Sequence, residues 1–120
     1  MRVLIADDEI QVRSALRLHL EEGAGVTVVG EADNSKEVLA KVEASRPNLV
    51  LLDWELPPNG GYAVLRTLRA ARPELAVLVL SGRPEVRSDA LAAGATAFVS
   101  KADSPEHLVA TILNRQVESR

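Results

Sequence analysis

Five polar side chains each follow a short apolar run in this sequence, and together they could do chemistry. They are Asp7, Asp8, Asp53, Ser81 and Lys101. Three carboxylates about 5 Å apart repel one another by roughly 3 kcal/mol per pair at an effective dielectric constant of about 20, so such a cluster needs a cation or bound protons. Oxygen ligands without Cys or His favour Mg²⁺, which is often completed by water and phosphate oxygens. The five residues therefore predict a site that holds a divalent cation and a phosphoryl group on a carboxylate.

Asp53 is the central member of this set, because the apolar residues 49–52 lead straight into it. A continuous apolar run between turn signals is typical of a strand that is buried on both faces of a parallel sheet. Open α/β sheets bind their ligands at the edge where such strands end. Taken alone, the stretch leaves a second interpretation open, in which Asp53 only caps a turn, as Asp often does.

Five apolar runs alternate with five segments of helical spacing. The runs cover residues 3–6, 26–32, 49–52, 76–80 and 96–100. Strand followed by helix, repeated five times, predicts a parallel sheet with helices on both faces. We therefore expect a doubly wound α/β domain, a (βα)5 sandwich, and by analogy the flavodoxin-like strand order 2-1-3-4-5. The fourth helix is expected to run from Pro84 to Gly94.

Size and composition limit the kinds of protein that this sequence can form. A chain of 120 residues is long enough for one hydrophobic core, so we expect a single domain over residues 1–120. The net charge of −3 argues against a nucleic-acid-binding surface, which is normally basic. The absence of Cys rules out disulfides and permits a cytoplasmic location. The first apolar run is too short for a signal peptide or a membrane span.

The spacing of these residues carries a resemblance to a known family over essentially the whole chain. The matching positions are Asp7, Asp8, Asp53, Pro57, Gly61, Ser81 and Lys101. In this pattern the chain resembles the receiver (REC) domain of two-component response regulators. Segment 92–106 is most similar to receivers that precede a LuxR/NarL-type DNA-binding domain. The resemblance implies a bacterial, cytoplasmic phosphoprotein that takes part in signal transduction and transcription regulation.

The resemblance implies a role for each residue that would meet the phosphoryl group. Asp53 would be the phosphoacceptor, attacking a kinase phosphohistidine in line to form an aspartyl phosphate. Lys101 would pair with the phosphoryl group, and Ser81 would hydrogen-bond it. Phe98 matches the aromatic residue that turns inward when Ser81 moves, so that strand five and its flanking helices become the output surface. A lone Phe in a strand is equally well explained as a core residue.

The resemblance also implies a metal site. Mg²⁺, or Mn²⁺ in its place, would be bound directly by Asp8, Asp53 and the backbone carbonyl group of Glu55. Asp7 would act mainly through a metal-bound water. The phosphoryl donor would be a sensor histidine kinase or a phosphotransfer protein, and phosphorylation would be linked to formation of a homodimer. The chain would not be an enzyme on a separate substrate, because it would catalyse only its own phosphorylation and slow dephosphorylation. An effector domain is absent from residues 1–120, so we expect either a truncated form of a longer protein or a protein that signals alone.

Three positions depart from the common pattern of the family, and one of them is Gly82, which follows Ser81 where many receivers have Ala. Glu55, two residues beyond Asp53, could reach the phosphoryl group, the cation or Arg83, and we expect it to alter the lifetime of the aspartyl phosphate. Ala102 follows Lys101 where many receivers have Pro after a cis bond. Because a cis bond before a residue other than Pro costs about 3–4 kcal/mol, we expect a trans Lys101–Ala102 bond.

Three other functions compete with this interpretation. The first is a receiver-like docking module that is never phosphorylated, although such a module would not need the clustered charges. The second is a phosphatase of the haloacid-dehalogenase type, which also uses a strand-end Asp with an acid two residues on, but near the first strand of a longer chain. The third is a flavin carrier, in which the acids after the first strand would repel the flavin phosphate.

Overall fold

The structure is a computed structural model that describes residues 1–23 and 25–118, with side chains up to Asn114. Its five strands are β1 (Arg2–Ala6), β2 (Thr27–Ala32), β3 (Leu49–Asp53), β4 (Ala76–Ser81) and β5 (Ala97–Ser100). Its helices are α1 (Ile10–Gly23), α2 (Val38–Ser45), α3 (Gly61–Ala71), α4 (Arg87–Ala92) and α5 (Pro105–Glu118), with a 3-10 turn, η1 (Pro84–Val86), before α4. None of the helices in the described part of the chain is both long enough and apolar enough to cross a membrane.

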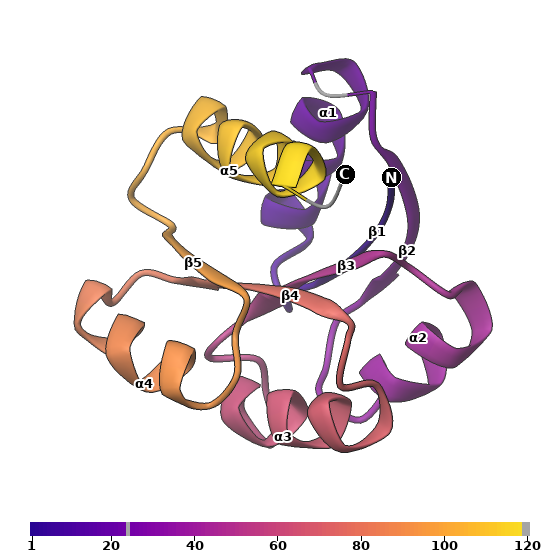
Figure 1. Cartoon of the computed structure of the whole chain (residues 1–120), viewed down its shortest axis with the longest axis vertical. Helices are drawn as coiled ribbons and strands as arrows, with labels where there is room; N and C mark the ends of the chain where they lie inside the picture. The colour runs from indigo at the N-terminus through magenta and orange to yellow at the C-terminus, as the bar shows by residue number, and fades with distance from the viewer. Residues whose placement is uncertain (24, 119–120) are drawn as a thin grey trace.

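All neighbouring strands pair in parallel, in the order β2-β1-β3-β4-β5. Helices α1 and α5 cover one face of the sheet, and α2, α3 and α4 cover the other (Figure 1). The predicted doubly wound fold and its flavodoxin-like strand order are therefore confirmed. Because every crossover in this topology runs through a helix, the carboxyl ends of all five strands lie along the same edge.

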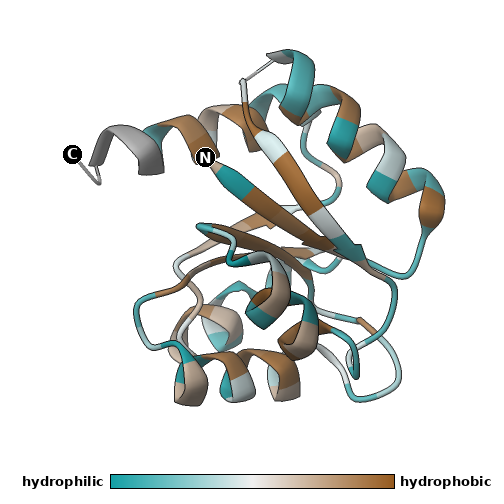
Figure 2. Cartoon of the chain, turned by 90° about the vertical axis from the view of Figure 1, so that its right-hand side faces the viewer, coloured by the Kyte–Doolittle hydropathy of each residue, from teal (hydrophilic) through white to brown (hydrophobic). Residues whose placement is uncertain are grey.

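Each face of the sheet buries its own hydrophobic cluster. On one face, Leu20 of α1 and Ile112 of α5 pack against the strands. On the other, Val42 of α2 and Leu65 of α3 belong to the second cluster. All five residues of β3 are buried, as expected for a central strand with helices on both sides. Figure 2 shows the result: the strands are largely hydrophobic, and the helices alternate between hydrophobic and hydrophilic residues.

The segment between Pro84 and Gly94 differs from the single helix that the sequence predicted. It begins as the 3-10 turn η1, in which the N–H of Val86 bonds to the carbonyl group of Arg83. The α-helix proper covers only Arg87–Ala92, and Gly94 follows with a φ of 107°. A tighter first turn of this kind is common at helix starts. The Lys101–Ala102 bond is trans, as predicted, and the cis bond in the described part of the chain joins Pro57 to Pro58.

Candidate functional site

Three carboxylates meet at the carboxyl edge of the sheet. The strand register pairs Ala6 with Leu52, so Asp7 and Asp53 leave neighbouring strands side by side. One ligand atom from each of Asp7, Asp8 and Asp53 lies within 4.8 Å of the others. Asp7 and Asp53 are 1% and 2% exposed, whereas Asp8 is exposed. The structure thus brings the three predicted acids together, with two of them shielded from water and the third open to it.

Lys101 brings a positive charge to this cluster from the end of β5. Its Nζ lies 2.9 Å from Asp7 Oδ2 and 3.3 Å from Asp53 Oδ1. The side chain reaches past β4, which separates β3 from β5 in the sheet. A flexible Lys side chain can make both contacts, because its ammonium group is a compact point charge that can exchange one partner for another.

The pKa values of this group follow from its burial and its charges. Burial raises the pKa of Asp53 to about 6, against the opposing effects of the Glu55 N–H bond and of Lys101. Burial alone would lower the pKa of Lys101, but the carboxylates of Asp7 and Asp53 outweigh it and raise that pKa. One ammonium group therefore does not fully offset the cost of placing these acids in a buried site.

The donor set suits a divalent cation. Asp7 Oδ1 accepts a hydrogen bond from the N–H of Glu9 at 2.9 Å, and Asp53 Oδ1 accepts one from the N–H of Glu55 at 3.0 Å. Asp7 Oδ2 is buried, and its contact among the described residues is with the ammonium group of Lys101 at 2.9 Å. A buried carboxylate oxygen with spare capacity beside an exposed Asp8 matches the oxygen ligands that Mg²⁺ prefers.

Ser81 takes part in a contact that sequence reasoning did not predict. Its buried hydroxyl group lies 3.0 Å from both carboxylate oxygens of Glu55, to which it donates. Arg83 Nη2 lies 3.1 Å from Glu55 Oε2, and the N–H of Arg83 donates to Ser81 Oγ at 3.0 Å. Of the three partners considered for the Glu55 side chain, the structure therefore shows Arg83, and it adds Ser81.

Gly61 is needed where α3 begins close to the strand end. A Cβ atom at this position would lie 2.7 Å from Trp54 Cα and 2.8 Å from the carbonyl oxygen of Asp53. The N–H of Gly61 also bonds to the carbonyl oxygen of Trp54 at 2.7 Å. Only Gly allows helix and strand to approach this closely, which explains its spacing from Asp53.

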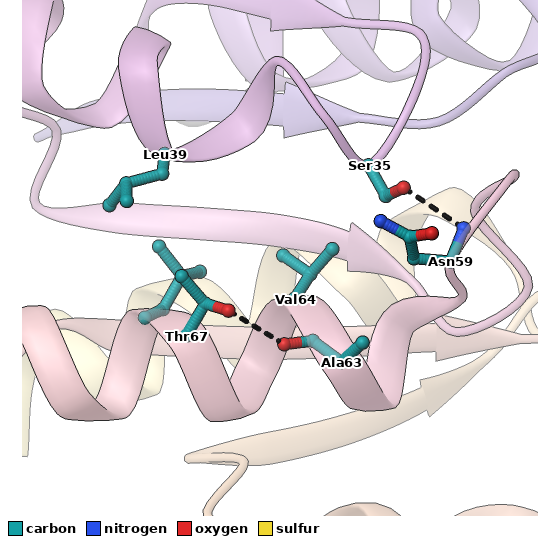
Figure 3. Close-up of a pocket in the computed structure, with 7 residues that line it drawn as sticks. Ser35, Leu39, Asn59, Ala63, Val64 and Thr67 are labelled. Atoms are coloured by element: carbon teal, nitrogen blue, oxygen red, sulfur yellow. Dashed lines mark hydrogen bonds between the residues drawn. The ribbon is translucent and has the colours of Figure 1, made fainter.

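The loop between β3 and α3 is held from its other side by the segment before α2. The N–H of Asn59 donates to Ser35 Oγ at 3.0 Å (Figure 3). The N–H of Ser35 donates in turn to the carbonyl oxygen of Pro57 at 2.7 Å. These bonds fix the loop that carries Glu55.

Phe98 lies in β5 and is 7% exposed, in the hydrophobic cluster that α2, α3 and α4 cover. The guanidinium carbon of Arg87 lies 6.0 Å from the centre of its ring. This placement agrees with a core residue, and the switch role of Phe98 stays a prediction.

Comparison with known proteins gives this site its context. The family model for the response regulator receiver domain matches residues 3–113. The transcriptional activator protein ExaE of Pseudomonas putida is 38% identical over 107 residues, which are 88% of this chain and 50% of that protein. A protein-glutamate methylesterase/protein-glutamine glutaminase of Symbiobacterium thermophilum is 40% identical over 104 residues, which are 84% of this chain and 29% of that protein.

Solved structures agree with the sequence relatives. The crystal structure of a LuxR-family two-component response regulator from Aurantimonas sp. SI85-9A1 superposes with a TM-score of 0.91 at 28% identity, covering 98% of this chain and 85% of that one. This chain spans about half the length of most curated relatives that it matches. The part that this chain shares with transcription regulators and with a methylesterase is thus the segment that the receiver-domain model matches. The chain belongs to the response regulator receiver domain family, and its structural neighbours include LuxR-family response regulators.

Proposed function

We propose that this receiver accepts a phosphoryl group on Asp53 in a Mg²⁺-dependent reaction. The observation that carries the proposal is the contact of the Lys101 ammonium group with two buried carboxylates, at 2.9 and 3.3 Å. Burying a cluster of charges destabilises the fold, and such clusters occur mainly at functional sites. A divalent cation bound together with a phosphoryl group would offset the negative charge of the carboxylates.

In the proposed reaction, an Asp53 carboxylate oxygen attacks phosphorus in line. The new O–P bond forms as the P–N bond of a donor phosphohistidine breaks, and the histidine leaves. Asp8, Asp53 and the backbone carbonyl group of Glu55 would hold Mg²⁺ or Mn²⁺, with Asp7 acting through a bound water. The cation would neutralise charge on the phosphoryl oxygens and on the attacking carboxylate.

Two side chains would then change partners. Lys101 would move its ammonium group from the free carboxylates to a phosphoryl oxygen. Ser81 would turn its hydroxyl group from Glu55 towards the phosphoryl group, and Phe98 would respond to that movement. The surface around β5 and its flanking helices would carry the signal to an output domain, a partner or a second copy of the chain.

The phosphoryl donor and the cellular location belong to the same proposal. A sensor histidine kinase or a phosphotransfer protein in the cytoplasm would supply the phosphoryl group. The chain itself would catalyse only its own phosphorylation and slow dephosphorylation. It would bind neither nucleic acid nor membrane directly. This restriction agrees with its net charge of −3.

Intact mass measurement after incubation with acetyl phosphate and Mg²⁺ tests the proposal. We expect a gain of one phosphoryl group, stable to acid and labile to base, that is lost with EDTA and in Asp53→Asn. Asp33→Asn is the matched control, because Asp33 is exposed and lies outside the site. If neither acetyl phosphate nor a cognate kinase modifies the protein although Mg²⁺ binds, the proposal is wrong and the chain is a docking module.

A further inference from the structure

A hollow on the face of the molecule that carries α3 and α4 is lined by two of the three aromatic residues in the chain. Its lining residues are Trp54, Tyr62, Asp89, Ala92 and Ala93, and its volume is about 450 Å³. Trp54 is half-buried and Tyr62 is 51% exposed. The receiver chemistry proposed above uses neither ring, so both are free for another role.

The two rings meet at nearly a right angle and form an aromatic corner. Their centroids lie 6.2 Å apart and their planes meet at 83°. The backbone of Trp54 is pinned on both sides, because its N–H donates to Leu80 and its carbonyl oxygen accepts from Gly61. In such an edge-to-face pair the rings contact each other, and the exposed part of Tyr62 stays open to a group that enters the hollow from solvent.

Asp89 gives the hollow a negative charge. Its exposed carboxylate forms no ion pair with any residue that the structure describes. The small side chains of Ala92 and Ala93 leave room beside it. An anion would be repelled here, and a neutral apolar group would gain nothing from Asp89. A cation would be attracted both by the carboxylate and by the negative faces of the rings.

The chain itself shows which cation its aromatic rings accept. The guanidinium carbon of Arg66 lies 5.9 Å from the centre of the Tyr62 ring, and Arg87 holds a similar position over Phe98. Arg66 does not line the hollow, so it contacts Tyr62 from outside the hollow. A planar guanidinium group can stack on a ring and bind a carboxylate at the same time, which an ammonium group does less well.

We propose that the hollow formed by Trp54, Tyr62 and Asp89 binds an arginine side chain presented by a partner protein. The guanidinium group would lie against the aromatic corner and pair with Asp89, and its methylene stem would cover Ala92 and Ala93. Because Trp54 directly follows Asp53, this surface lies next to the proposed phosphorylation site without sharing its side chains.

The single Trp of the chain allows a direct test by fluorescence and by NMR chemical shifts of the Ala92 and Ala93 amides. The probe is N-acetylarginine amide, with N-acetylcitrulline amide as its neutral counterpart, in excess Mg²⁺ so that the acid cluster does not compete. We expect saturable binding of the arginine probe, and weakening of about three- to fivefold in Tyr62→Leu and in Asp89→Asn.

Two matched variants control this test. Tyr62→Phe keeps a ring and is expected to bind like the parent protein, and Glu85→Gln removes a nearby charge that does not line the hollow. Circular dichroism checks that each variant is folded. Equal binding of the citrulline probe, tighter binding of N-acetyllysine amide, or unchanged affinity in both Tyr62→Leu and Asp89→Asn would overturn the proposal.

Discussion

The two edges of the sheet both hold partly buried cationic side chains, but they use them differently. At the amino edge, Arg69 donates to the carbonyl oxygens of Gly94 and Leu75 at 2.8 and 2.6 Å and to the hydroxyl group of Thr96 at 3.3 Å. At the carboxyl edge, Lys101 faces the carboxylates of Asp7 and Asp53. The first cation satisfies neutral acceptors, whereas the second partly balances charges that exceed its own.

This difference explains why one edge is a scaffold and the other a candidate site. The amino edge is also closed by Asn48, whose Oδ1 accepts the N–H of Arg2 at 2.7 Å and whose N–H bonds back to the carbonyl oxygen of Arg2 at 2.8 Å. Such neutral bonds do not change with pH or with added cations. At the carboxyl edge, protons and the proposed Mg²⁺ and phosphoryl group would all interact with the same carboxylate oxygens, so we expect the stability of that edge to depend on pH and on added cations.

Of the substitutions considered, Asp53→Asn should have the largest effect on the free energy of unfolding. In metal-free protein the pKa of Asp53 is raised to about 6 from an ordinary value of 3.8. The folded state therefore keeps its proton where the unfolded state has lost it, and the free energy of unfolding falls as the pH rises from about 4 to about 6. Above that range the cost is at most about 3 kcal/mol, and Asp53→Asn removes it.

Denaturant unfolding in EDTA between pH 4 and 8 measures this effect. We expect the parent and Asp53→Asn curves to converge at low pH and to separate above pH 6, with the variant more stable. Mg²⁺ should then stabilise the parent and leave the variant nearly unchanged. Parallel curves across the whole pH range would show that the surroundings of Asp53 do not raise its pKa.

Arg69→Met tests the other edge. Removing the guanidinium group leaves the carbonyl oxygens of Gly94 and Leu75 without this donor, so we expect a loss of about 2 kcal/mol in the free energy of unfolding. The loss should be the same with Mg²⁺ or EDTA and at pH 5 or 8. Arg66→Met on the same helix serves as the control, because Arg66 is exposed, and should cost at most about 0.5 kcal/mol. A Mg²⁺-dependent loss in Arg69→Met would mean that the two edges are coupled.

Glu55→Ala should have the smallest effect of the three substitutions, and it tests the role of the Glu55–Ser81 contact at the carboxyl edge. In the proposed reaction the Glu55 carboxylate would compete with the phosphoryl group for the Ser81 hydroxyl group, which lies 3.0 Å from it. Its removal should favour the phosphorylated form and slow dephosphorylation by about threefold. The decay of the phosphorylated mass in excess EDTA measures the rate, and Glu55→Gln, which keeps an acceptor oxygen, should lie between. Identical decay in the parent and Glu55→Ala would rule out this role.

Much of the architecture could be read from local patterns. The three inner strands β1, β3 and β4 follow from continuous apolar runs, because burial on both faces demands apolar side chains. The positions of Asp7, Asp53 and Lys101 at strand ends then place them on one edge, since parallel strands share their direction. The helix from Pro84 was expected in one piece and is not, because a local signal for a helix start does not distinguish a 3-10 turn from an α-helical one.

Local sequence patterns predicted the strands and the chemical types gathered at one edge, and the strand order came by analogy with the flavodoxin-like fold. Which of these side chains contact one another depends on the tertiary structure. The register that pairs Asp53 with Leu80 places Ser81 beside the loop that carries Glu55, and no local pattern contains that register. The corner of Trp54 and Tyr62 beside Asp89 depends in the same way on how α3 and α4 pack on the sheet. Contacts between residues distant in sequence arise from packing of whole elements, which short-range spacing does not record.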